Sequence, residues 1–153
     1  MASTLDVTMP IEYREFAIGD YEAAVELWSA ADGVVLRDAD SRAGIARYLV
    51  RNPGLSFVAT DGSRVVGTVL CGHDGRRGYL QHLAVALDRR RRGIGRTLVG
   101  RALAALHGAG IQKCHLMVLP ANEAARAFWR SLGWVERSDV VLMSHTPSSA
   151  PNA

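Results

Sequence analysis

Cysteine is scarce in this sequence of 153 residues, and its two copies are not arranged for metal binding or redox chemistry. Cys71 and Cys114 both fall in segments with the apolar character of strands. There is no C-x-x-C pair and no His/Cys cluster with metal-ligand spacing. We therefore expect two reduced, buried thiols and no metal ion, a pattern typical of a cytoplasmic protein.

Long apolar runs are also missing. No segment approaches the roughly 18 consecutive apolar residues of a membrane span, and residues 1–9 lack the basic start and apolar block of a secretory signal. The composition, 48% hydrophobic and 22% charged, is that of an ordinary globular domain. We predict a single domain over residues 10–143, flexible tails at 1–9 and 144–153, a cytoplasmic location and no membrane partner.

A basic, glycine-bearing turn, Arg90-Arg91-Arg92-Gly93-Ile94-Gly95, stands between a strand-like segment at 79–86 and apolar residues at helical spacing over 96–106. A strand, a turn and a helix in this order point free backbone N–H groups at one spot. The first turn of a helix carries unsatisfied N–H donors and a partial positive charge, so it attracts phosphate. Glycines allow a large anion to approach the backbone. The segment therefore predicts a binding site for a diphosphate.

Two common phosphate-binding patterns do not fit this turn. The dinucleotide fingerprint needs a glycine where Leu98 stands, and the P-loop needs a lysine and a hydroxyl where Arg101 and Ala102 follow Gly100. A plain surface turn and a nucleic-acid patch are the alternatives. A nucleic-acid reader usually adds exposed aromatic residues or a recognisable reading module, and the sequence shows neither. We therefore favour an anionic cofactor and predict no nucleic-acid partner.

The pattern Arg90-x-x-Gly93-x-Gly95, after a strand ending in Leu-Ala-Val, resembles the acyl-CoA signature of the GNAT superfamily of N-acetyltransferases. A second block is similar to that family's downstream helix and its Leu-Gly-aromatic end: Asn122-x-x-Ala125-x-x-Phe128-Trp129-x-x-Leu132-Gly133-Trp134. The resemblance implies a mixed α+β fold. In this fold a central, mostly antiparallel sheet contains a splayed strand pair and is flanked by helices.

The local patterns follow the element order of this fold. Strands are expected at 11–18, 56–60, 64–72, 79–86, 111–119 and 134–143, and helices at 21–31, 41–50, 96–106 and 122–132. Asp61-Gly62 indicates a hairpin between the second and third strands. Asp20, Ser41 and Asn122 are residue types that cap helix starts.

The resemblance implies that acetyl-CoA is the cosubstrate. Backbone N–H groups from Arg90 to Thr97 would bind its diphosphate, with the arginines adding charge. The backbone of Leu83 and Val85 would pair with the pantetheine arm, and an N–H near Leu83 would polarise the thioester carbonyl. The expected cofactor-binding residues are Leu83, Val85, Arg90, Arg91, Arg92, Gly93, Ile94, Gly95, Arg96, Thr97, Asn122 and Trp129.

The groups that move protons are less clearly marked. Many family members have a glutamate where Tyr79 stands, and neither Tyr79 nor Gln81 is a good base at neutral pH. His73 and Asp74, in the turn before this strand, are the predicted bases, although an Asp-Gly pair is also simply a good turn. His82 is out of phase with Gln81 and is expected on the opposite face of the strand.

Trp129 stands where many members have a tyrosine that protonates the leaving thiolate, and an indole N–H is no usable acid. Tyr79 or Tyr48 could serve instead, or the thiolate leaves with hydrogen bonding alone. The tryptophan also leaves open a non-catalytic acyl-CoA-binding or sensing module. We predict acetyl transfer to a primary amine of a small molecule or peptide by direct attack on the thioester. The predicted catalytic residues are Leu83, Tyr79, His73 and Asp74.

The identity of the acceptor amine is not evident from the sequence. The resemblance places its site near the first two helices, where the loop between them carries mixed charge, including Asp38, Asp40 and Arg37. Neither a clearly acidic nor a clearly basic pocket follows from that pattern. A homodimer is compatible with the sequence.

Overall fold

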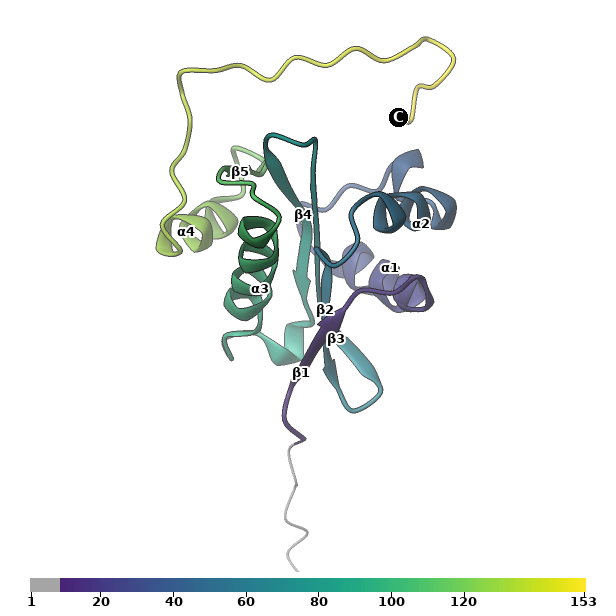
Figure 1. Ribbon diagram of the computed structural model, residues 1–153, viewed down its shortest axis with the longest axis vertical. Helices are drawn as coiled ribbons and strands as arrows, with labels where there is room; N and C mark the ends of the chain where they lie inside the picture. The colour runs from purple at the N-terminus through teal and green to yellow at the C-terminus, as the bar shows by residue number, and fades with distance from the viewer. Residues whose placement is uncertain (1–8) are drawn as a thin grey trace, which may run out of the picture.

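A five-stranded sheet in the order β1-β2-β3-β4-β5 forms the centre of the computed structural model, which describes residues 9–153 (Figure 1). Neighbouring strands run antiparallel except for β4 and β5, which run parallel. This confirms the mixed, mostly antiparallel sheet. The strands are β1 (Glu12–Glu15), β2 (Phe57–Asp61), β3 (Arg64–His73), β4 (Gly78–Val85) and β5 (Cys114–His115).

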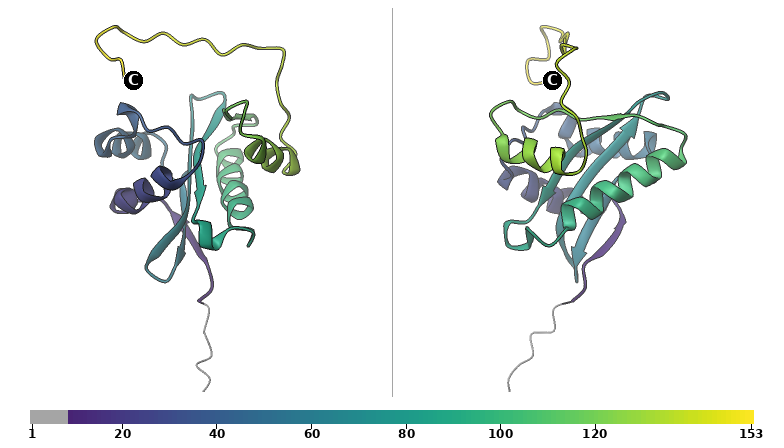
Figure 2. Two further views of the ribbon diagram at one scale, coloured as in Figure 1. Left: turned by 180° about the vertical axis from the view of Figure 1, so that it is seen from behind. Right: turned by 90° about the vertical axis from the view of Figure 1, so that its left-hand side faces the viewer.

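Helices cover both faces of the sheet (Figures 1 and 2). On one face lie α1 (Tyr21–Ala30) and α2 (Arg42–Arg51), and on the other α3 (Ile94–Gly108) and α4 (Glu123–Ser131). Three short 3-10 turns are η1 (Ile18–Asp20), η2 (Asp38–Asp40) and η3 (Leu87–Arg89). The predicted helices are thus all present, with small shifts at their ends.

Two of the expected helix caps are confirmed. The Ser41 side chain accepts a hydrogen bond from the N–H of Gly44 at 3.1 Å, and Asn122 Oδ1 accepts one from the N–H of Ala125 at 3.1 Å. Asp20 occupies the N-cap position of α1, as predicted, but its side chain makes no capping hydrogen bond to that helix. Its carboxylate instead accepts two hydrogen bonds from the Arg14 guanidinium, each 2.8 Å, and one from the N–H of Ala17 at 3.0 Å.

The sheet separates two apolar clusters, one under α3 and one under α1 and α2. Along β3, Val69 and Cys71 belong to the α3 cluster and Leu70 to the other, as the alternation of a strand requires. Trp28 of α1 is fully buried, and its Nε1 donates a hydrogen bond to Thr68 Oγ1 at 2.9 Å. The core therefore lies on both sides of the central strands.

The ladder between β3 and β4 contains a bulge at His82. The register passes from Thr68 opposite Ala84 to Leu70 opposite Gln81, and His82 has a positive φ of 49°. The His82 ring packs against the edge of Trp28, with ring centroids 4.8 Å apart, on the face that Gln81 also occupies. The expectation that His82 points away from Gln81 was wrong, because alternation is interrupted at a bulge.

Strands β4 and β5 separate soon after they begin. Their pairing covers only Gly78 with Cys114 and Tyr79 with His115, so the fifth strand is much shorter than the predicted 111–119. From Leu80 to Val85, the β5-facing edge of β4 has no strand partner within residues 9–153. This is the splayed strand pair that the sequence predicted.

The strand predicted for residues 134–143 is not formed, and this prediction was wrong. The chain leaves α4 in an extended course and crosses above the sheet toward α2 (Figure 1). Its apolar side chains are between 60% and 88% exposed at Val140, Val141, Leu142 and Met143. The two-residue β5 offers too little edge for a further strand to pair with.

The predicted tails are the two ends of the chain, and the structure describes only the C-terminal one in full. Residues 1–8 of the proposed N-terminal tail lie outside the described residues. At the other end, Asn152 Nδ2 donates a hydrogen bond to Asp38 Oδ1 at 2.9 Å. No helix within residues 9–153 is both long enough and apolar enough to cross a membrane.

Candidate active site

The turn between β4 and α3 presents backbone donors that the helix does not use. Gly93 is the N-cap of α3, in the left-handed region with φ 79°. Its carbonyl accepts hydrogen bonds from the Thr97 N–H at 3.0 Å and the Thr97 hydroxyl at 2.9 Å. The N–H groups of residues 94–96 come before this first helical bond and have no acceptor in the helix. Together with the helix dipole, they form a site suited to a phosphate.

The arginines of this turn fall into two groups. Arg89 is paired with Asp61 at 2.8 Å and with Asp88 at 2.9 Å, and Arg90 Nε donates to the Val85 carbonyl at 3.2 Å. The other side chains have no hydrogen bond or ion pair within residues 9–153 and are exposed: Arg91, Arg92 and Arg96. Their guanidinium groups are therefore available to an anionic ligand.

Gly95 lies where β4, α3 and α4 meet. A Cβ built on it would stand 3.4 Å from Phe128 and 3.8 Å from Val85. Phe128 packs edge-on against Trp129, which packs edge-on against Trp134, with ring centroids 5.1 Å apart in both pairs. These aromatic rings lie on the α4 side of Gly95, and the role of Trp129 in cofactor binding stays a prediction.

The open part of β4 contains Leu83 and Val85. Both side chains pack against the α3 cluster, so it is their backbone that faces the opening. In the ladder between β3 and β4, neither His82 nor Leu83 has a partner residue on β3. The Thr68 hydroxyl donates to the His82 carbonyl at 2.9 Å and so holds the bulge in place. The Leu83 N–H thus lies at the point where the strand is irregular and its outer edge is free.

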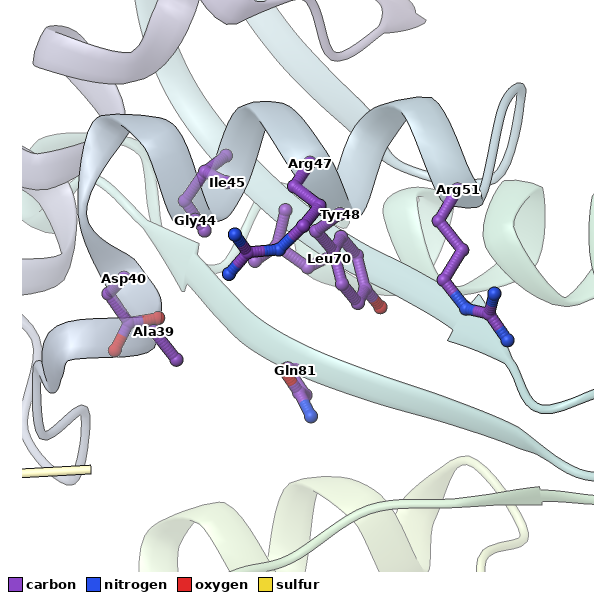
Figure 3. A pocket seen from close by; sticks show the side chains of 9 residues that line it. All are labelled: Ala39, Asp40, Gly44, Ile45, Arg47, Tyr48, Arg51, Leu70 and Gln81. Atoms are coloured by element: carbon purple, nitrogen blue, oxygen red, sulfur yellow. The ribbon is translucent and has the colours of Figure 1, made fainter. Parts of the chain in front are cut away.

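A pocket of about 260 Å³ opens on the other face, between α2 and β4 (Figure 3). Gln81 enters it from β4, two positions before Leu83. The pocket and the open strand edge therefore approach one another from opposite sides of β4. The lining residues are Ala39, Asp40, Gly44, Ile45, Arg47, Tyr48, Arg51, Leu70 and Gln81.

His82 and Asp40 form a hydrogen-bonded pair beside this pocket. Nε2 of His82 lies 2.7 Å from Oδ1 of Asp40, and the two side chains are only 16% and 12% exposed. With the Asp40 oxygen as the acceptor, Nε2 of His82 carries the proton and Nδ1 keeps a lone pair. Nδ1 has no hydrogen-bond partner among the described residues. The pair therefore provides an oriented imidazole that can accept a proton.

Sequence reasoning did not identify this pair, because its members are 42 positions apart and only the bulge brings the imidazole to the correct face. A histidine in an otherwise apolar strand was the one available signal. Nothing in the spacing of Asp38-Ala-Asp40-Ser41 distinguishes a histidine partner from a helix-capping segment.

The predicted bases His73 and Asp74 are engaged in the β3–β4 turn. His73 Nδ1 accepts from the Gly75 N–H at 3.0 Å, and Asp74 Oδ1 accepts from the N–H groups of Arg76 at 2.7 Å and Arg77 at 2.8 Å. These backbone hydrogen bonds, that from Arg77 first, hold the pKa of Asp74 below its usual range. A lowered pKa makes a weaker base.

Neither His73 nor Asp74 lines the pocket between α2 and β4, and their catalytic role stays a prediction. Tyr79 belongs to the last β4–β5 pair and is 38% exposed. Its ring centroid lies 5.9 Å from that of His115. The assignment of Tyr79 to catalysis likewise stays a prediction.

Burial controls the ionisation of Tyr48 and both cysteines. It raises the pKa of Tyr48, whose hydroxyl is buried without a hydrogen-bond partner. It raises the pKa of Cys71 to about 12 and that of Cys114 to about 11. Because a thiolate is the reactive form of cysteine, neither thiol is suited to accept an acyl group at neutral pH. Within residues 9–153, no cluster of three or more His, Cys, Asp or Glu side chains is placed to hold a metal ion.

Comparison with known proteins gives one consistent result. The model of the acetyltransferase (GNAT) family matches residues 21–134. An acetyltransferase of Pectobacterium atrosepticum is 37% identical over 123 residues, which are 80% of this chain and 86% of that protein. An acetyltransferase of Sodalis glossinidius is 34% identical over 134 residues, or 87% of this chain and 93% of its own.

Solved structures agree at the level of the fold. The PaiA N-acetyltransferase of Thermoplasma acidophilum, in complex with coenzyme A, has a TM-score of 0.73 to this chain. The two are 23% identical, and the match covers 86% of this chain and 94% of that one. The overall fold described above is therefore similar to that of a protein solved in complex with coenzyme A.

Proposed function

The chain belongs to the acetyltransferase (GNAT) family and is an acetyltransferase, and from this premise we propose that it transfers the acetyl group of acetyl-CoA to a primary amine. The acceptor is a small molecule or a peptide. One arrangement carries the proposal: unused N–H donors at the start of α3 continue into the open edge of β4, and a pocket reaches the same strand from its other face.

The residues of the turn fit the anionic end of acetyl-CoA. The diphosphate would bind the backbone from Arg90 to Thr97, with charge supplied by the unpaired Arg91, Arg92 and Arg96. Gly93 and Gly95 leave the approach to Ile94 and its neighbours open. The Arg90 side chain already donates a hydrogen bond to the Val85 carbonyl. We therefore propose that Arg90 contacts the diphosphate through its backbone.

The remaining cofactor contacts follow the opening along β4. Leu83 and Val85 would pair with the pantetheine arm through their backbone, while Trp129 forms a wall. Asn122 Oδ1 is used by the α4 cap, which leaves its Nδ2 for the ligand. Acetyl-CoA supplies an acetyl group that is already activated as a thioester.

The chemistry requires a neutral amine and stabilisation of a developing negative charge. We propose that the N–H of Leu83 donates to the thioester carbonyl oxygen, where such donors act most strongly. We propose His82 as the base that takes the amine proton on Nδ1, with Asp40 orienting the ring and stabilising its charged form. Support for His82 over His73, Asp74 and Tyr79 comes from its hydrogen bond to Asp40, which lines the pocket, and from its unused ring nitrogen.

Direct transfer from thioester to amine is the simplest route for this site. A two-step route through an acylated cysteine would need a thiolate, and burial keeps both Cys71 and Cys114 protonated. A free thiol with a pKa near 8.5 is a tolerable leaving group, so the lack of a tyrosine at position 129 need not prevent transfer.

A non-catalytic acyl-CoA-binding module is the second candidate function. The tryptophan at position 129, where an acid is usual in the family, is the observation that favours it. Both functions predict acetyl-CoA binding, which isothermal calorimetry measures directly. Absence of binding would contradict both, and turnover with amines separates them.

We further propose a single acetyltransferase domain over residues 10–143, a tail over 144–153, a cytoplasmic location and a homodimer. The free thiols and the need for acetyl-CoA support the location. Support for the dimer comes from the exposed apolar side chains at 140–143 and from a second hollow of about 520 Å³ beside β5, with Leu132 and Trp134 in its lining. The occupant that we propose for this hollow is the 140–143 segment of a second copy.

A further inference from the structure

The pocket between α2 and β4 is lined by three hydrogen-bond donors that have no partner among the described residues. Arg47 and Arg51 lie one helical turn apart on α2, and both are exposed. The Tyr48 ring lies between them, and its hydroxyl is buried and unpaired. In Figure 3 the Arg47 guanidinium extends toward the Asp40 side of the pocket and the Arg51 guanidinium toward the other side, with Tyr48 between them.

The lack of partners is particular to this part of α2. Arg42, at the start of the same helix, is paired with Glu22 at 2.7 Å. Two like charges spaced four residues apart on a helix repel one another. A bound anion between Arg47 and Arg51 would offset that repulsion.

One end of the pocket carries a negative charge instead of a positive one. Asp40 is the only carboxylate that lines it, and its Oδ1 is already bonded to His82. In Figure 3, Asp40 and Arg51 stand at the two ends of the lining side chains, with Arg47, Tyr48 and Gln81 between them. An acceptor with its amine near Asp40 and β4 would therefore have its remaining groups between Arg47 and Arg51.

We propose that the acceptor amine carries an anionic group, best matched by a carboxylate, which Arg47 and Arg51 bind. This inference rests on the proposed acetyl transfer to an amine in this pocket. A carboxylate has enough lone pairs to accept from both guanidinium groups, and the planar guanidinium matches its two oxygens. The volume of about 260 Å³ lies below that of pockets for drug-sized ligands, about 300–1,000 Å³, so the acceptor is of amino-acid size.

Polyamines and other polycationic amines are disfavoured by the same geometry. Their second ammonium group would face two guanidinium groups that have no counter-ion among residues 9–153. The anionic class is therefore favoured by charge.

The test is a matched series of ω-aminoalkanoates, ω-aminoalkylphosphonates, n-alkylamines and diamines of equal chain length. Their binding to the CoA-loaded protein is measured by calorimetry, and their acetylation by CoA release. We expect the affinity and the acetylation rate to be about tenfold or more higher for aminoalkanoates than for alkylamines. A tenfold difference in affinity corresponds to about 1.4 kcal/mol. Diamines should rank lowest. The phosphonates show whether any anion suffices or whether a carboxylate is preferred, and a preference for either over alkylamines supports the proposal.

Substitutions on α2 test whether Arg47 and Arg51 cause the preference for anionic amines. Arg47→Gln combined with Arg51→Gln should raise KM for aminoalkanoates about tenfold or more, leave KM for alkylamines unchanged and leave the Kd of acetyl-CoA unchanged. Arg42→Gln removes one charge from the same helix outside the pocket and should change none of these. All three arginines are exposed, so the variants should fold, and circular dichroism checks this.

Two results would overturn the proposal: wild-type protein that binds alkylamines as well as aminoalkanoates, or a preference that survives in the double variant. If no amine is acetylated, the proposed acetyl transfer fails, whereas the calorimetric comparison still decides whether the pocket selects an anionic amine. The two failures are therefore distinguishable.

Discussion

At the scale of single residues, His82 connects the pocket to the open edge of β4. Its positive φ turns the ring toward Asp40, and the next residue is Leu83. We expect His82→Gln to lower kcat by about 100-fold or more, because a positioned general base contributes about 10²–10⁴. The Kd of acetyl-CoA should not change. Steady-state kinetics and calorimetry on the same samples check this.

His73→Gln is the informative comparison, because His73 is the competing prediction for the base. Its Nδ1 accepts a hydrogen bond from the turn backbone, so we expect only a small loss of activity. A larger loss in His73→Gln than in His82→Gln would show that the turn supplies the base and that the assignment to His82 is wrong.

Asp20 links residue chemistry to the stability of the fold. The Arg14 guanidinium, and to a lesser degree the Ala17 N–H, hold the pKa of Asp20 below its ordinary value in spite of partial burial. A carboxyl with a depressed folded pKa contributes stability above its unfolded pKa of 3.8 and loses it as pH falls through the folded pKa. Asp20→Asn should therefore lower the free energy of unfolding by about 1 kcal/mol at neutral pH.

The difference between wild type and Asp20→Asn should shrink below pH 4, where the wild-type carboxyl becomes protonated too. Urea unfolding across a pH series measures it. Glu12→Gln serves as the control. Glu12 lies on β1, the strand that also carries Arg14, and has no hydrogen-bond or ion-pair partner among the described residues. A difference that stays constant with pH would contradict the role of the Arg14–Asp20 pair.

At the scale of elements, the start of α3 should decide cofactor binding. Gly95→Val adds a side chain between Phe128 and Val85, in the first turn of α3 that we propose binds the diphosphate, so we expect CoA binding to be lost while the fold survives. Gly100→Val is the matched control, since Gly100 lies on the same helix and a Cβ there would meet nothing within 4 Å. Calorimetry with CoA measures both. Unchanged CoA affinity in folded Gly95→Val would refute the diphosphate site.

Elements differ in how far their sequence determines them. Ser41 and Asn122 indicate where α2 and α4 begin, because capping is a local interaction, and Asp61-Gly62 marks the β2–β3 hairpin for the same reason. The residues at 134–143 have the character of a strand but pair with nothing, because a strand needs an edge and β5 provides only two residues. Pairing depends on distant neighbours, which local pattern does not specify.

The candidate site also has parts that the sequence predicts and parts that it does not. The basic, glycine-bearing turn at Arg90–Gly95 could be predicted because its strand, turn and helix are contiguous in the chain. The His82–Asp40 pair and the pocket under α2 join segments that are far apart, and they depend on a bulge for which the sequence has no signal. Contiguous features could therefore be predicted, and assembled ones could not.

At the scale of the whole molecule, the exposed apolar segment at 140–143 should mediate self-association. Leu142→Asp together with Val140→Asp introduces charge on side chains that are 73% and 60% exposed. We expect light scattering to give a dimer for wild type and a monomer for the variant, with similar circular dichroism. Val50→Asp, on an 82% exposed side chain of α2, controls for surface charge. A monomeric wild-type protein would contradict the proposed dimer.

Acetyl transfer to an amine is the central claim, and its most direct test is turnover of acetyl-CoA with a panel of primary amines that includes ω-aminoalkanoates. Release of CoA is followed with a thiol reagent, and mass spectrometry identifies the acetylated amine. The account predicts CoA release that depends on the amine and matches the acetylated product in amount. Acetyl-CoA that binds but is released as CoA only at the background rate, with every amine tested, would contradict it in favour of a non-catalytic acyl-CoA-binding module.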